Sequence, residues 1–398
     1  MQSINNEELT LIRSQTPGTG NLAHFNNAGS SLPPDQVVEA VIEYLKKEAL
    51  FGGYETEAKY IDHLSNVYHN IAKLVNADTD EIALFENASA AWGTAFKGLT
   101  FQEGDEIITT EMEYVTNLIG LVDMQKQEGV TVKVISNDEN GNFSVIALER
   151  EITPNTKLIA VTHVSSSGGS ILPVEEIGDI AEKYGILYLV DACQSAGQMP
   201  IDVRKIKCDM LSATGRKYLR APRGTGFLFV KRKSLDKLTP VLLDFLAAGQ
   251  VSLHGYTLRQ DARRFELYEK SRALTIGLGA AVEYAINIGL DRIWERIYYL
   301  SILLRNQLGK IPRIVVRDLG DKLSGIVTFS AENVDSQLIK AKLSGLGINV
   351  SVGGSQATPI YMEKSKLQTL VRASVHYYNT EEEITKLCRA LRVILEDE

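Results

Sequence analysis

Short apolar segments alternate with longer segments of helical periodicity over residues 82–230, and this alternation limits the possible folds more than any other feature. Apolar segments of strand length occur at 82–85, 106–109, 132–135, 158–161, 186–190, 209–211 and 226–230. Strands that are apolar nearly throughout, and that are separated by helices, are typical of a mainly parallel sheet covered on both faces. The sequence therefore predicts an α/β fold with a mainly parallel, seven-stranded type of sheet, whose ligands bind beyond the carboxyl ends of the strands.

A second, smaller unit is predicted in the C-terminal part of the chain. The length of 398 residues exceeds what one core usually holds, which favours two domains. The pattern predicts a long helical stretch over about 274–308, then short strands at 314–316, 326–329 and 370–374, and a last helix from Thr380. We predict a large domain of residues 20–285 and a smaller α+β domain made of residues 1–19 and 286–398.

An amphipathic helix is predicted near the N-terminus. Val38, Ile42 and Leu45 recur there at helical spacing, and Asp35 stands just before them as the expected N-cap.

Composition and charge narrow the classes of partner. The formal net charge is −8 and there is no run of Lys and Arg, so nucleic acid is not an expected partner. No apolar stretch approaches the length of a membrane span, and the first residues lack the features of a signal peptide. Three widely spaced cysteines favour a reducing cytoplasm over a disulfide framework. The six histidines form no metal-ligand spacing, so no metal site is predicted.

Lys217 occupies an unusual position, because it lies in a short loop between two apolar strands. Lysine is seldom buried unless its charge is removed or paired. A Schiff base removes the charge, and both burial and the neighbouring cation Arg216 favour one by lowering the pKa of the amine. The hypothesis is that Lys217 carries pyridoxal 5′-phosphate (PLP); the alternative is a solvated lysine in a loop.

Further candidates follow the predicted strands. Asp191 closes an apolar strand, where its carboxylate either pairs with the protonated pyridine nitrogen of PLP or caps the next turn. Gln194, three residues on, is expected to reach the ring's phenolic oxygen. Ala88 and Ser89 begin a helix whose free N–H groups suit a phosphate, although small residues at a helix start are commonly structural.

Two other side chains fit the same hypothesis. Tyr114, after the strand at 106–109, offers an aromatic face to a flat cofactor ring. Arg372 lies inside an apolar strand of the smaller unit, where its guanidinium either grips the α-carboxylate of an amino acid or forms a structural ion pair.

Several motifs together resemble the class V aminotransferase family of fold-type I PLP enzymes, and within it the cysteine desulfurase and selenocysteine lyase branch. They are V-D-A-C-Q-S-A at 190–196, S-A-T-G-R-K at 212–217, R-F-E at 264–266, G-L-G-A-A at 277–281, V-R-A-S at 371–374 and Y-N-T-E-E at 378–382. The resemblance extends from Asn26 to Thr380, and it implies the fold-type I architecture and PLP as cofactor.

The resemblance also implies a role for each matching residue. Lys217 is the catalytic Schiff-base lysine, Asp191 and Gln194 contact the ring, and Tyr114 stands where many members stack a histidine. The implied phosphate ligands are Ala88, Ser89, Thr214 and Arg216, and the implied substrate ligands are Arg372 and Asn27. Tyr268 and Glu269 stand where desulfurases have a Gly-Thr pair that reaches the partner's phosphate, which implies a homodimer with shared active sites.

The departures from the desulfurase pattern decide the predicted reaction. The catalytic cysteine of desulfurases is replaced by Gln356, the usual histidine before the lysine by Arg216, and the ring asparagine by Ser166. Without a mobile thiolate, transfer of sulfur to the enzyme is not expected. These departures resemble the branch of C–S lyases, hercynylcysteine sulfoxide lyases and isopenicillin N epimerase-like proteins.

We therefore predict a PLP-dependent C–S β-lyase that converts cysteine, or a cysteine S-conjugate or sulfoxide, into pyruvate, ammonia and a sulfur product. The alternatives are an epimerase or aminotransferase of the same family, a desulfurase that works despite Gln356, and a catalytically silent scaffold.

Overall fold

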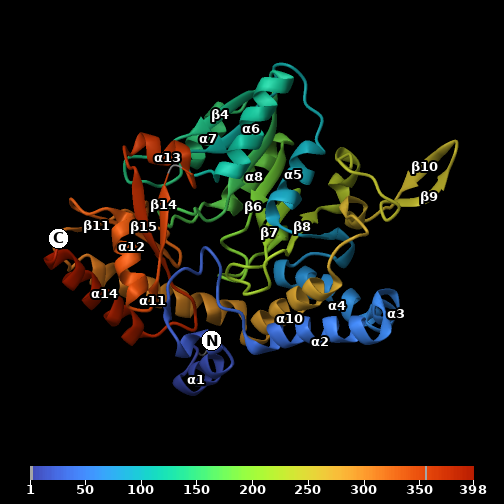
Figure 1. Cartoon of the computed structure of the whole chain (residues 1–398). Coiled ribbons are helices and arrows are strands. Elements are labelled where there is room, and N and C mark those ends of the chain that lie inside the picture. The colour runs from blue at the N-terminus through green and yellow to red at the C-terminus, as the bar shows by residue number, and fades with distance from the viewer. Residues whose placement is uncertain (1–2, 355) are drawn as a thin grey trace.

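The computed structural model describes residues 3–354 and 356–398, and its centre is a seven-stranded sheet (Figure 1). Its strands lie in the order β2-β8-β7-β6-β5-β3-β4, and all are parallel except β8, which is antiparallel to both neighbours. Their bounds are β2 Ile82–Phe85, β3 Glu106–Thr110, β4 Thr131–Ile135, β5 Thr156–Thr162, β6 Leu187–Asp191, β7 Met210–Thr214 and β8 Gly226–Val230. The predicted α/β fold with a mainly parallel sheet is confirmed.

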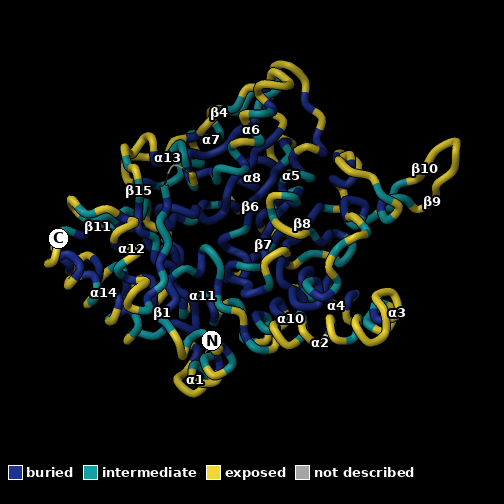
Figure 2. Tube along the Cα trace, viewed as in Figure 1, coloured by how far each residue is buried: buried dark blue, intermediate teal, exposed yellow. Residues whose placement is uncertain are grey.

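Helices cover both faces of this sheet, because alternate residues of each strand point to opposite sides. Ile159 and Val161 of β5 join one buried cluster, whereas Leu158 and Ala160 join another. The first cluster packs under α4 (Ile61–Val75) and α8 (Val174–Tyr184), and the second under α5 (Ala88–Lys97) and α6 (Val115–Glu128). The buried strands in Figure 2 lie between these helical layers.

The C-terminal part has a separate hydrophobic cluster around an antiparallel sheet of order β11-β12-β15-β14. Its strands are β11 Ile314–Val316, β12 Ile326–Ala331, β14 Ser351–Gly354 and β15 Thr369–Ser374, and its helices are α11 Leu290–Leu308, α12 Ser336–Gly345, α13 Pro359–Lys364 and α14 Glu381–Glu396. The N-terminal segment belongs here too. Ile4 and Ile12, beside and in α1 (Asn6–Ser14), join this cluster, and β1 (Ala23–His24) pairs with β13 (Ile348–Asn349).

The helical stretch expected over about 274–308 consists of two helices, because the chain bends there by 79°. Helix α10 (Arg272–Ile288) ends at Gly289, whose φ of +96° is strained for any residue with a side chain, and α11 begins at Leu290. The predicted domain boundary at 285/286 falls in the last turn of α10, and the division into domains stays a prediction.

No single helix among the described residues is long and apolar enough to cross a membrane, while the bent pair α10 and α11 meets that criterion together by length and composition alone.

Helix α2 (Asp35–Phe51) forms as predicted but begins differently. Pro34 occupies the N-cap position, so Asp35 is the first helical residue, where its charge still favours the positive end of the helix. Its apolar stripe is not covered: Val38, Ile42 and Leu45 are 41%, 45% and 50% exposed.

A second exposed apolar feature is the hairpin of β9 (Ala248–Ser252) and β10 (Gly255–Leu258), which projects from the body (Figure 1). Leu253 at its tip is fully exposed and Val251 is 70% exposed. Apolar side chains this exposed mark a surface that another chain can cover.

Candidate active site

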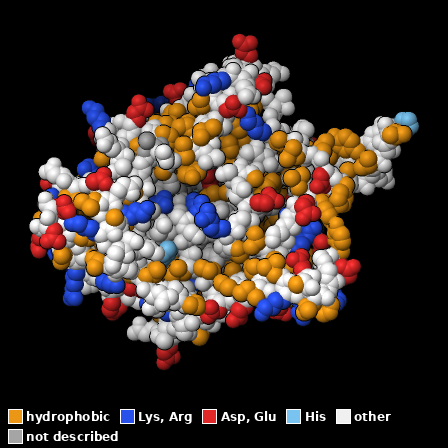
Figure 3. All heavy atoms as spheres, viewed as in Figure 1, with side chains coloured by type: hydrophobic (Ala, Val, Ile, Leu, Met, Phe, Trp, Pro, Cys, Tyr) orange, Lys and Arg blue, Asp and Glu red, His pale blue; other side chains and the backbone are white. Residues whose placement is uncertain are grey.

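A cavity opens at the carboxyl ends of the central strands, where the parallel sheet predicted a ligand site. It holds about 570 Å³ of space, its open mouth included. Basic side chains gather around a hollow at the centre of the face shown in Figure 3. The cavity is lined by Asn87, Ala88, Ser89, Tyr114, Asn117, Thr162, Ser166, Asp191, Cys193, Gln194, Thr214, Arg216 and Lys217.

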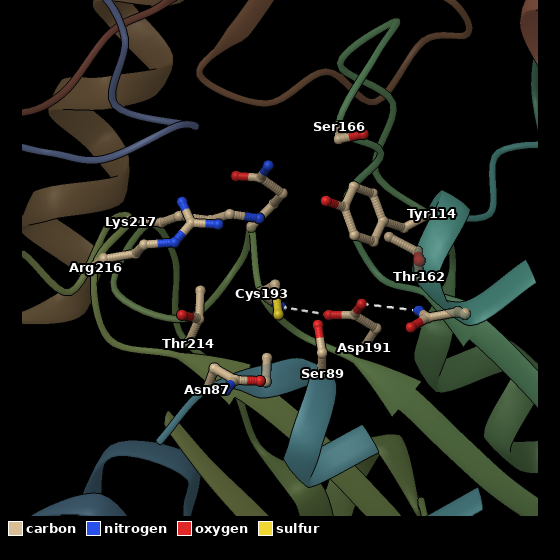
Figure 4. A pocket seen from close by; sticks show the side chains of 13 residues that line it. Asn87, Ser89, Tyr114, Thr162, Ser166, Asp191, Cys193, Thr214, Arg216 and Lys217 are labelled. Atoms are coloured by element: carbon tan, nitrogen blue, oxygen red, sulfur yellow. Dashed lines mark hydrogen bonds between the residues drawn. The ribbon is translucent and has the colours of Figure 1, made fainter. Parts of the chain in front are cut away.

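Lys217 enters this cavity from the loop after β7 and is only 7% exposed. Its Nζ lies 5.7 Å from the centre of the Tyr114 ring, on the opposite side of the cavity in Figure 4. Burial, assisted by the charges of Arg216 and Arg372, lowers the pKa of Lys217 to about 8. An amine with this pKa is a usable nucleophile and base near neutral pH.

The Lys217 loop is held by close backbone packing. Gly197, in the turn after β6, has a φ of +84°, and a Cβ there would come within 2.6 Å of the backbone of Tyr218 and Leu219. Only glycine therefore lets the turn that contains Gln194 lie against the loop that contains Lys217.

Asp191 ends β6 and is buried, with each carboxylate oxygen accepting one hydrogen bond from the chain. Oδ1 accepts from the Cys193 backbone N–H (2.8 Å) and Oδ2 from the Asn117 amide (2.9 Å), as the dashed lines in Figure 4 show. The bond from the Cys193 N–H shows that Asp191 caps the turn after β6, as the alternative in the sequence analysis predicted. Among the described residues no cation pairs with Asp191, so its buried charge is available to a cationic ligand group.

The candidate phosphate site lies at the N-terminus of α5. Asn87 caps the helix by accepting from the Ala90 N–H (2.8 Å), and Ala88 and Ser89 form the first turn. Gly226 lets β8 approach this turn, since a Cβ there would lie 3.1 Å from the Ala88 nitrogen. Thr214 lines the same cavity, and so does Arg216, whose guanidinium also donates to the Gly29 carbonyl.

Arg372 approaches from the C-terminal unit. Its Nε donates to Ser351 Oγ (3.0 Å) and its Nη1 to the Ser166 carbonyl (3.0 Å). The ion pair considered as its alternative does not occur among the described residues. Because Ser166 lines the cavity, the bond to its carbonyl places the guanidinium beside the cavity, although Arg372 is not part of the lining.

Asn27 and Tyr268, two of the predicted site residues, do not line this cavity. Asn27 is fully buried, and its amide donates to the His24 and Ser374 carbonyls while its Oδ1 accepts from the Tyr378 hydroxyl. It therefore holds the 26–31 turn and does not face the cavity. Tyr268 lines a different pocket with Arg263 and Arg272, so its predicted contact with a cofactor requires a second subunit.

Some lining residues were not anticipated. Cys193 and Thr162 follow or end strands, so the strand-end rule would have found them. Asn117 lies on α6, and it links Asp191 to Glu113, a carboxyl that is 1% exposed. Cys193 is a poor nucleophile, because burial and the Asp191 carboxylate raise the pKa of its thiol well above the usual range.

The lining fits PLP in its chemistry. It offers a buried carboxylate without a cation, a helix N-terminus with an adjacent arginine, and an amine of lowered pKa. Two buried oxygens, Gln194 Oε1 and Ser166 Oγ, have no hydrogen-bond partner in the described chain, which suits a polar ligand placed between them.

Comparisons with known proteins agree with this fit. The family described as aminotransferase class-V matches residues 23–387. A probable cysteine desulfurase of Methanothermobacter thermautotrophicus is 32% identical, with 96% of this chain and 97% of that protein covered. The apo structure of a cysteine desulfurase from Thermococcus onnurineus NA1 has a TM-score of 0.92 at 29% identity, covering 100% of this chain and 99% of that one.

A more distant structure shows the same fold. The cystine C-S lyase C-DES, solved in complex with its reaction product cysteine persulfide, has a TM-score of 0.86 at 22% identity, covering 95% of this chain and 99% of that one.

Proposed function

This chain belongs to the class V aminotransferase family and is a PLP-dependent enzyme, and we propose that it is a carbon–sulfur β-lyase. The proposed substrate is cysteine or a cysteine S-conjugate or sulfoxide, and the products are pyruvate, ammonia and the released sulfur compound.

The proposal rests on the absence of an available thiolate at the cavity. Gln356 stands where desulfurases carry the catalytic cysteine in the resemblance described above, and it lies on an exposed loop. Of the three described cysteines, only Cys193 lines the cavity, and its raised pKa keeps it a thiol. Sulfur transfer to the protein needs a thiolate, whereas elimination does not. The cystine C-S lyase C-DES has the same fold, which is consistent with elimination on it.

The residues of the cavity divide the work as follows. When bound, PLP supplies an electron sink for negative charge at the substrate Cα. Asp191 and Gln194 would hold the ring, the first turn of α5 with Thr214 and Arg216 would hold the phosphate, and Tyr114 would offer its aromatic face to the ring.

Lys217 is the proposed attachment point and the proposed base. With substrate bound, the neutral amine of Lys217 would take the Cα proton, the Cα–H electron pair would form the Cα–Cβ double bond, and the Cβ–S bond would break with its electrons leaving on sulfur. Arg372 binds the substrate α-carboxylate with the N–H groups not used by Ser351 and Ser166. Water then releases ammonia and pyruvate.

Product analysis tests the proposal. The PLP-loaded enzyme is supplied with cystine or a cysteine sulfoxide conjugate, and pyruvate is expected in a one-to-one ratio with ammonia. Alanine without pyruvate would instead identify a desulfurase. Deuterium entering Cα from solvent with the amine retained would identify an epimerase, and turnover that depends on a keto acid would identify an aminotransferase.

A homodimer with shared active sites is part of the proposal. The uncovered stripe of α2 and the projecting hairpin supply apolar surface for a second copy, and hydrophobic side chains along both are visible in Figure 3. Tyr268 and Glu269 would then approach the partner's cavity. Light scattering is expected to give twice the monomer mass of 43.9 kDa, and a monomer would refute this part.

The cytoplasmic location expected from the sequence also stays a proposal. It is supported by the three cysteines, which are all free.

A further inference from the structure

Behind Asp191 lies a second buried carboxyl group, Glu113, which the proposed reaction does not use. It sits between β3 and α6 and is 1% exposed. The Asn117 amide nitrogen donates one hydrogen to Asp191 Oδ2 and the other to Glu113 Oε1, each at 2.9 Å. The two carboxylate oxygens are therefore no farther apart than twice that distance.

Glu113 is held in place from four directions. Its Oε1 also accepts from the Tyr114 backbone N–H (2.8 Å) and from the Thr162 hydroxyl, and its Oε2 accepts from the Thr109 hydroxyl (3.2 Å). These donors come from the ends of β3 and β5 and from the start of α6. A side chain fixed this firmly fixes the Asn117 amide in turn, so that its N–H rather than its oxygen faces Asp191.

No cation of the described residues compensates Glu113. Glu111, two residues earlier, is paired with Lys364 of α13 (2.6 Å), and His163 after β5 is kept neutral by burial, which lowers its pKa to about 4. Lys217 lies across the Tyr114 ring, and Asp191 contributes a like charge. Burial raises the pKa of Glu113 to about 7. The hydrogen bonds that Glu113 accepts oppose this rise, and the charge of Asp191 adds to it.

We propose that Glu113 is a positioning residue which, through Asn117 and Asp191, sets how strongly the PLP ring nitrogen holds its proton. Two buried like charges this close oppose each other's ionisation, and Glu113, whose pKa is raised, holds a proton in the acidic form of the site. When Glu113 loses that proton, a second negative charge lies behind Asp191 and the ring nitrogen binds its proton more tightly. This inference rests on the proposed placement of the ring nitrogen at Asp191.

The test follows the ring nitrogen directly in the PLP-loaded enzyme. With PLP labelled with ¹⁵N in the ring, the nitrogen chemical shift is recorded between pH 5.5 and 9. The wild type is expected to show a step with its midpoint near pH 7, and Glu113→Gln, which keeps the shape but cannot ionise, is expected to lack it. Glu111→Gln is the matched control, because Glu111 is also buried but bonded to Lys364, and it is expected to keep the step.

The outcomes separate this inference from the proposed site. A step that persists in Glu113→Gln, or a flat wild-type titration, overturns the role of Glu113. Asp191→Asn is expected to leave the ring nitrogen unprotonated throughout, and a protonated nitrogen in that variant overturns the placement at Asp191 instead. If Glu113→Gln does not fold, infrared spectra of the wild type decide: a protonated carboxyl band that disappears with the same midpoint supports the inference, and its absence overturns it.

Discussion

The floor and the roof of the cavity differ in how they are built. The floor consists of strand ends of the large sheet, and Asp191, Thr214 and Lys217 are all buried there next to short loops. The roof comes from the antiparallel sheet and its loops, where Arg372 is partly exposed and Gln356 is exposed. The departures from the desulfurase pattern lie on both sides: Arg216 and Tyr114 line the floor, Ser166 lines the cavity after β5 and bonds to Arg372 through its carbonyl, and Gln356 lies on the roof. We infer that the floor sets the cofactor chemistry and the roof sets the substrate.

Lys217→Ala tests this division most strongly, because Lys217 is the only lysine among the described residues that line the cavity. Turnover is expected to fall by about 10²–10⁴-fold, the usual contribution of a general acid–base group. The visible absorbance of the lysine-bound cofactor is expected to disappear, since the covalent link cannot form. Absorbance spectroscopy and a pyruvate assay on the same sample measure both.

Lys231→Ala is the matched control, because Lys231 directly follows the neighbouring strand β8 but does not line the cavity. It is expected to leave both signals intact. A Lys217→Ala variant that keeps its visible band would show that the cofactor is attached to another residue. That result would contradict the role of the floor in the cofactor chemistry.

Arg372→Ala tests whether the roof binds the substrate, and its effect on the kinetics is expected to be smaller than that of Lys217→Ala. A hydrogen-bonded pair with a charged group is worth about 1.5–3 kcal/mol, so KM for the amino-acid substrate is expected to rise roughly 10- to 100-fold. The visible absorbance of the cofactor is expected to stay unchanged, because Arg372 does not line the floor. Steady-state kinetics measure the change in KM, and a spectrum of the free enzyme measures the absorbance of the cofactor.

Arg317→Gln serves as its control, since Arg317 belongs to the same unit and bonds to the Ser330 hydroxyl (2.9 Å), away from the cavity. If Arg372→Ala instead abolished cofactor binding and left KM alone, the roof would not be the substrate side.

Much of the floor could be predicted from the sequence, because its signals are local. Asp191 closes an apolar strand and Lys217 lies in the short loop after another, and parallel strands bring their carboxyl ends together. Glu113 and Asn117 gave no such signal. Their link to Asp191 joins residues 74 positions apart and depends on the order of β3, β5 and β6 in the sheet, which apolar periodicity does not specify.

Three other features that the sequence left unspecified have similar causes. Gly289 lies between two segments of helical periodicity, so the sequence pattern gives no sign of a bend there. The bend follows from the backbone conformation of Gly289. The amphipathic pattern of α2 predicted the helix correctly, but it does not state what covers the apolar stripe. The amide of Asn27 is bonded to His24, Ser374 and Tyr378, which are distant in sequence or buried beside it, so only the packed structure shows that it is occupied.

The smallest predicted effect concerns the burial of the floor itself. Burial lowers the pKa of Lys217 to about 8 from its ordinary value of 10.5, and only the neutral amine can attack the aldehyde of PLP. Because the amine loses its proton as pH rises, the rate of cofactor uptake by the apo enzyme is expected to increase about tenfold between pH 7 and pH 9 and to level off above it. Stopped-flow absorbance measures this rate. A rate that still climbs steeply toward pH 10.5 would mean that Lys217 titrates as an exposed lysine, and the contrast between a buried floor and an open roof would not hold.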